Sequence, residues 1–148
     1  MKNAFTIIEL VFVIIVIGIL AGIAMPRFFQ VGYSAHEAKL VGFTSSLNRT
    51  AGHEMWAVSM STGHQGSVKF IGTNTYKYFR KIPKEILNKE VNLSNCGTGM
   101  YQTVAEANTS YTGGIEYNIT CKDGDATTPP FFKLIRQDGK VLVSRGNE

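Results

Sequence analysis

The chain has 148 residues, a formal net charge of +4, and 44% hydrophobic residues. This length accommodates one membrane segment and one domain of about 100 residues with a modest core. The net charge is too small to indicate a nucleic-acid partner, and a basic cluster between positions 69 and 89 is interpreted as a solvated face. The cluster consists of Lys69, Lys77, Arg80, Lys81, Lys84 and Lys89.

The most distinctive stretch is an apolar run from Phe5 to Met25. As a helix, these 21 residues would be about 31 Å long, which matches the hydrocarbon core of a bilayer, about 30 Å thick. Only Thr6 and Glu9 are polar within it. A carboxylate deep in a membrane costs on the order of 2.5 to 3.5 kcal/mol, so we expect Glu9 to have a partner.

Two simple interpretations of the run are open at this point. One is a membrane anchor with Glu9 near its end, where the side chain extends to the lipid surface. The other is a secretory signal peptide, in which Gly22-Ile23-Ala24 supplies the small residues of a cleavage site. The second is disfavoured because the leader has only one basic residue, Lys2, and because Glu9 interrupts the apolar region.

A third interpretation comes from the order of the residues, which resembles the class III signal of type IV pilins and type II secretion pseudopilins. The resemblance rests on Ala4, the following Phe5-Thr6-Ile7-Ile8-Glu9, a Val/Ile/Leu run containing Gly18, and Pro26. It implies that prepilin peptidase cuts between Ala4 and Phe5 and that Phe5 is then N-methylated. The family most often has glycine before the cut, so Ala4 is a departure from its pattern.

The resemblance also assigns roles within the helix. In this family, the carboxylate at the position of Glu9, near Thr6, takes part in assembly by neutralising the N-terminal amine of an adjacent subunit. Opposite charges attract strongly among apolar helices, where either charge alone is costly. Pro26 cannot donate a hydrogen bond to the carbonyl of Gly22, and Gly18 and Gly22 add flexibility. The helix is therefore expected to be weakened near Pro26.

Beyond Pro26, apolar residues recur at helical spacing, which predicts that the helix bends there and continues to about Ser61. The predicted core stripe is Leu40, Phe43, Leu47, Ala51, Met55 and Val58.

Short β-prone runs and turns follow from Ser67. Residues 68–73 and 76–79 are predicted to pair as strands, residues 82–87 to form a helical turn near a proline, and residues 97–112 to contain loop. Residues 115–121 alternate between apolar and polar, which is typical of a half-buried strand. Residues 131–136 and 140–145 flank Asp138-Gly139, a favoured two-residue hairpin turn.

These patterns together predict an α+β fold, and the long helix fits the lollipop shape of the pilins that the N-terminus resembles. The resemblance implies that residues 1–4 are the leader, residues 5–30 the hydrophobic transmembrane and assembly helix, and residues 31–148 the globular head. In the head, the second half of the long helix packs on a small antiparallel sheet.

Two features of the head concern cross-links and metals. Cys96 and Cys121 form an even pair in an exported domain, which favours one disulfide over free thiols or shared metal ligation. Asp123 and Asp125 make calcium a minor candidate, because the full EF-hand spacing is absent. No other metal and no cofactor is expected.

The sequence contains no nucleophile motif, phosphate loop or dinucleotide fingerprint, so an enzyme is not favoured. The resemblance implies a structural subunit of a type IV pilus that serves adhesion, motility or DNA uptake, with features of the mannose-sensitive haemagglutinin group. A pseudopilin of a type II secretion system is the alternative. The implied partners are copies of the chain, prepilin peptidase and the pilus or secretion assembly machinery. The implied location is the bacterial inner membrane, crossed once with the head in the periplasm, and then a periplasmic or extracellular filament.

Overall fold

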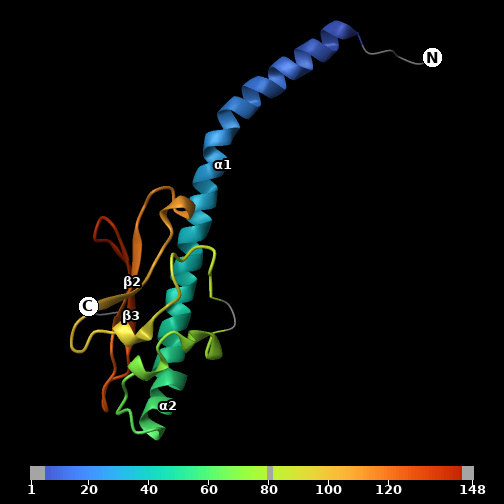
Figure 1. The fold of residues 1–148 in the computed structure, drawn as a ribbon. Helices are drawn as coiled ribbons and strands as arrows, with labels where there is room; N and C mark the ends of the chain where they lie inside the picture. Colours follow the sequence, from blue (N-terminus) through green and yellow to red (C-terminus); the bar gives the residue numbers. More distant parts are fainter. Residues whose placement is uncertain (1–5, 80–81, 145–148) are drawn as a thin grey trace.

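A computed structural model describes residues 6–79 and 82–144 of the chain. One long helix packs along a small antiparallel sheet, and its N-terminal part projects well beyond the sheet (Figure 1). The α+β lollipop predicted from the sequence is confirmed. The predicted cleavage site between Ala4 and Phe5 lies outside the described residues, as do Arg80, Lys81 and Arg145.

The long helix consists of α1 (Ile7–Thr50), a π-helical turn η1 (Ala51–Met55) and α2 (Trp56–Ser61). It ends at Ser61, as predicted. The α-helix continues through Pro26, and Figure 1 shows the blue N-terminal part of α1 curving away from the part beside the sheet. A bend of this kind is expected where a proline removes one helical hydrogen bond.

The predicted core stripe is confirmed from Leu40 to Met55, but Val58 is only half-buried and Ser59 is buried in its place. In a helix of 3.6 residues per turn, each four-residue step overshoots by about 40°. The wider π turn η1 offsets part of this drift. Ser59 thus stays on the core side, where its hydroxyl donates to the carbonyl of Ser67 over 2.7 Å.

Four antiparallel strands form the sheet in the order β1-β2-β3-β4. They are β1 (Gln102–Glu106), β2 (Tyr117–Lys122), β3 (Phe131–Arg136) and β4 (Val141–Val143). The alternating run predicted as a half-buried strand is β2, and its inward face is buried at Tyr117, Ile119 and Cys121, as its sequence pattern predicts.

Strand β1 lies within the stretch that was expected to contain loop. Its register against β2 shifts between Thr103 and Ala105, so two successive residues, Val104 and Ala105, are both buried. A bulge of this kind breaks the period of two by which a strand is recognised in a sequence. The strand was missed for this reason.

The predicted strand pair at residues 68–73 and 76–79 is wrong. These stretches form short 3₁₀ helices, η2 (Lys69–Ile71) and η3 (Asn74–Lys77). The buried residues there, Val68, Ile71, Thr75 and Phe79, are three or four positions apart, which is helical spacing and not strand alternation. Gly72 between the two turns has a φ of +59°, which no extended strand has.

Two of the predicted turns lie in the head, one near Pro83 and one between β3 and β4. Near Pro83 the predicted helical turn is present, because the carbonyl of Pro83 accepts from the amides of Ile86 and Leu87. The β3–β4 hairpin is also present, but its loop is not the predicted two-residue turn. Gly139 has a φ of +81° and Asp138 does not have a positive φ, so the loop is of the three-residue kind that ends on a left-handed glycine.

The head is tied together at two places. Cys96, after the short helix η4 (Leu93–Asn95), forms the predicted disulfide with Cys121 of β2, and both residues are buried. Asn48 of α1 binds the edge of β3 twice: its amide donates to the carbonyl of Phe132 over 2.9 Å, and its oxygen accepts from the amide of Phe132 over 2.7 Å. The helix and the sheet therefore share a fixed register.

We predict that Asn48→Ala lowers the free energy of unfolding by about 1 to 3 kcal/mol, because both backbone groups of Phe132 lose their partner on α1. Urea unfolding followed by circular dichroism measures the change. Asn95→Ala is the matched control, since its exposed side chain makes no hydrogen bond within the described residues. Equal stability of the two variants would contradict this role for Asn48.

Candidate functional site

The part of α1 that projects from the head is the candidate site, and we define the projecting segment as Ile7–Val31. Every residue in it is exposed except Ala24, which is half-buried. Its large apolar side chains keep between 37% and 83% of their surface exposed. No other part of the described chain exposes so continuous an apolar surface.

Such a surface is not stable in water. Soluble monomers rarely expose a contiguous apolar patch of more than a few hundred Å², and each large apolar side chain that leaves water stabilises the buried state by about 1.5 to 3 kcal/mol. By length and composition, the helix Ile7–Ser61 contains a stretch able to cross a membrane, and none of that stretch is buried within the chain. By its composition, the projecting segment is therefore suited to a membrane or to packing against other apolar surfaces.

Glu9 is the only charged residue in the apolar part of this segment that precedes Pro26. It lies in the first turn of α1, where its amide and that of Leu10 both donate to the carbonyl of Thr6. Thr6 caps the helix with an extended backbone and no side-chain capping bond. Within residues 6–79 and 82–144, the Glu9 carboxylate has no hydrogen bond or ion pair. Its negative charge is favourable at the N-terminus of the helix.

Gly18 and Gly22 occupy one face of the projecting segment, four residues apart. A Cβ atom added at either position would meet nothing within 4 Å, so contacts within this chain do not explain the two glycines. Small residues at this spacing allow another helix to approach closely. This second property of the pair was not recognised from the sequence, where Gly18, Gly22 and Pro26 were assigned to flexibility alone.

Three contacts form a collar where α1 enters the head. Tyr33 lies against Gly113, where an added Cβ would be 2.8 Å from the tyrosine ring. His36 meets Tyr111 of the short helix η5 (Thr109–Tyr111) edge-on, with 5.7 Å between ring centroids. The hydroxyl of Tyr117 donates to the carboxylate of Glu37. The collar fixes the point at which the helix becomes free of the head.

The bond between Tyr117 and Glu37 also sets the electrostatics of the collar. Burial raises the pKa of Tyr117 to about 12, and the hydrogen bond and negative charge of Glu37 act in the same direction. Nearby, Arg136 donates twice to Asp138, over 2.6 and 3.0 Å. The amide of Lys140, and then Arg136, lower the pKa of Asp138. Sequence reasoning missed the Tyr117–Glu37 pair, because no local pattern joins residues 80 positions apart.

The two carboxylates considered for calcium hold loops in place. Asp123 accepts from the hydroxyl of Ser67 and the amide of Val68. Asp125 accepts from the hydroxyl and amide of Thr127, and these bonds lower its pKa. In the described part of the chain, no group of three or more His, Cys, Asp or Glu side chains is placed to hold a metal.

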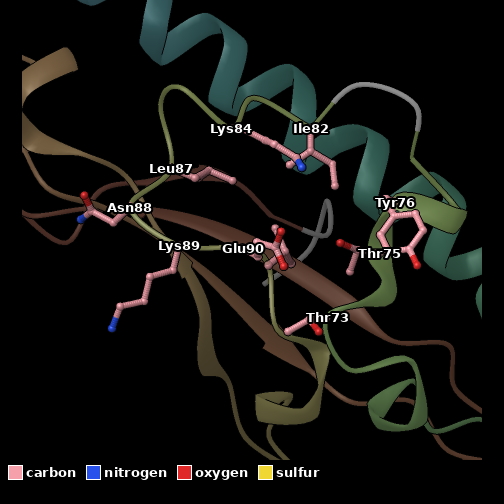
Figure 2. A pocket seen from close by; sticks show the side chains of 10 residues that line it. Thr73, Thr75, Tyr76, Ile82, Lys84, Leu87, Asn88, Lys89 and Glu90 are labelled. Atoms are coloured by element: carbon pink, nitrogen blue, oxygen red, sulfur yellow. The ribbon is translucent and has the colours of Figure 1, made fainter.

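The head also has a pocket of about 280 Å³, on the side of the 3₁₀ helix η3 (Figure 2). Its lining mixes hydroxyl, apolar and charged side chains, and Figure 2 shows Lys89 pointing away from it. Lys84 and Lys89 of the basic cluster belong to this lining, whereas Lys69 binds the hydroxyl of Thr98 over 2.7 Å. The described basic residues therefore have different local surroundings.

No protein-family model, curated protein or solved structure matches the chain. A function must therefore be argued from the projecting segment, the collar and the head themselves.

The pKa of Tyr117 gives a testable pH dependence. Between pH 10 and about 12 the unfolded chain loses the phenol proton while the folded chain keeps it, so the free energy of unfolding falls as the pH rises through this window. Tyr117→Phe should make this decline shallower, whereas Tyr76→Phe, at a tyrosine that is 69% exposed, should not. Urea unfolding at a series of pH values measures both, and identical slopes in all three proteins would refute the linkage.

Proposed function

We propose that the protein is a prepilin and that its mature form is a structural subunit of a type IV pilus. The observation that carries the proposal is the projecting segment, an apolar helix with a single carboxylate near its start and no cover from its own head. A helix built only to anchor an enzyme needs no such carboxylate. A helix that later packs against copies of itself can use the carboxylate to pair with a charge on a neighbouring subunit.

The energetics of assembly explain why Glu9 matters. Lipid tails are as apolar as leucine, so moving the projecting segment from a bilayer into a filament gains little from the hydrophobic effect. Close packing and charge pairing must then favour the filament. Gly18 and Gly22 offer a face for close packing, and Glu9 offers the charge. The membrane holds the subunit before assembly, and the filament holds it afterwards.

The partner of Glu9 follows from the processing that the sequence resemblance implies. Cleavage after Ala4 would leave a positively charged amine on Phe5, and the same position in a neighbouring subunit would meet Glu9. Among apolar helices the attraction between such charges is much stronger than in water. Because an unpaired charge there is costly, the pair would admit only one register between subunits.

The head supports the same function. The stripe of α1 and the collar hold the helix firmly against the sheet, so a force on one subunit would pass along α1 to the next. The disulfide between Cys96 and Cys121 suits an oxidising location outside the inner membrane. It also favours a pilus over the alternative, a pseudopilin of a type II secretion system. Both would use the projecting segment in the same way.

We predict that Glu9→Ala inserts into the inner membrane normally but assembles few or no filaments, because the neighbouring amine loses its partner. Electron microscopy of sheared filaments, with immunoblots of membrane fractions, measures both outcomes.

The matched control for that experiment is Glu54→Ala, which removes an exposed carboxylate from the part of the helix beside the head. It should assemble as the unsubstituted chain does. Normal filaments from Glu9→Ala would exclude charge pairing as the basis of assembly.

A further inference from the structure

Two separate segments carry exposed aromatic side chains at the end of the head from which the projecting segment emerges. On α1 these are Phe28, Phe29 and Tyr33, with 75%, 60% and 38% of their surfaces exposed. On η5 it is Tyr111, 43% exposed. Figure 1 shows η5, in orange, beside α1 at this end of the head. The collar contact between His36 and Tyr111 joins the two segments.

The length of the apolar helix sets the height of this aromatic group above a bilayer. From Leu10 to Phe29 the helix has 20 residues, or about 30 Å, which equals the hydrocarbon thickness. Because a carboxylate costs least at the membrane surface, this span begins after Glu9, five residues beyond the start of the apolar run at Phe5. Phe29 then lies at the other surface. Tyr33 is four residues beyond Phe29, about 6 Å along the axis, and the headgroup layer is about 5 to 8 Å deep.

The collar carries η5 to the same height. Tyr33 lies so close to Gly113 that an added Cβ would be 2.8 Å from its ring. The loop at residues 109–115 reads Thr-Ser-Tyr-Thr-Gly-Gly-Ile and has no charged side chain. It can therefore enter the headgroup layer without removing an unpaired charge from water. Tyrosine rings favour that layer because one end is apolar and the other forms hydrogen bonds.

The charged groups around the loop do not oppose this placement. Asp138 is paired with Arg136 over 2.6 Å, and Glu37 accepts from Tyr117. Arg27, two residues before Phe29, is exposed, and its side chain is long enough to extend to lipid phosphates. Exposed Glu116 remains beside the loop, and Lys140 follows the neighbouring hairpin turn. The two have opposite charges, so no net charge repels an anionic surface.

We infer that this end of the head, with Tyr33 and Tyr111, rests in the lipid headgroup layer while the projecting segment is inserted. The inference depends on the proposed membrane-anchored subunit and adds a second contact with the membrane, made by the head itself. The head is then seated on the bilayer and not tethered above it. Departure into a filament must release this seat as well as the helix.

Depth-dependent fluorescence quenching tests the seat on the full chain in vesicles of phosphatidylethanolamine and phosphatidylglycerol. The acyl chains are brominated near the headgroup, and unbrominated vesicles provide the reference intensity. Tyr111→Trp and Tyr33→Trp should both be quenched. The matched control is Tyr76→Trp on η3, towards the α2 end of the head, which is 69% exposed and should not be quenched. Native Trp56 is a background common to all variants.

The variant Phe29→Trp distinguishes failure of the seat from failure of the helix to insert. If Phe29→Trp is quenched and neither Tyr111→Trp nor Tyr33→Trp is, the helix is inserted and the seat of the head is refuted. If Phe29→Trp is not quenched either, the helix is not inserted, and the anchored subunit and its seat are both refuted. Quenching of Tyr76→Trp as strong as that of Tyr111→Trp would show nonspecific adsorption and would also refute the seat.

Discussion

The structure depends on one constraint, that the apolar side chains of Ile7–Val31 cannot remain in water. Nothing in the described part of the head covers them. The free-energy cost of exposing so many apolar side chains far exceeds the marginal stability of a domain, about 5 to 15 kcal/mol. In the proposed subunit, this surface is covered first by lipid and then by other helices. The proposal gives Glu9 a partner only in the second environment, so Glu9 would distinguish between the two.

The head holds the second part of this helix in a fixed position. Its core stripe buries one face of α1, Asn48 fixes the register with β3, and the collar closes around residues 33–37. The disulfide between Cys96 and Cys121 joins the segment before β1 to β2. The head therefore follows α1 as one body. In the proposed membrane-anchored subunit, the position of α1 in the bilayer would determine where the collar and η5 lie.

Much of the fold was predictable because its signals are periodic and local. The stripe from Leu40 to Met55 has the helical period, and β2 has the strand period. The prediction was wrong where the backbone forms a bulge or a 3₁₀ turn. The bulge at Val104 removed the alternation of β1, and 3₁₀ turns at residues 69–77 gave β-prone residues a helical spacing. A single π turn was enough to exchange Val58 for Ser59 in the core.

Only part of the candidate site was predictable from the sequence. Glu9 is conspicuous in the sequence because a carboxylate in an apolar run is costly. The collar was not, since Glu37 and Tyr117 meet only after the sheet has formed. The partner proposed for Glu9 belongs to another molecule, so the structure of a single chain does not display it.

The most direct test of the account is the N-terminal residue of the mature protein isolated from its native cell, determined by mass spectrometry. We predict that the chain begins at Phe5, that this residue carries one methyl group, and that Glu9 is retained. A chain that begins at Met25 would show that the apolar run is a removed secretory signal, and it would contradict the proposed subunit outright.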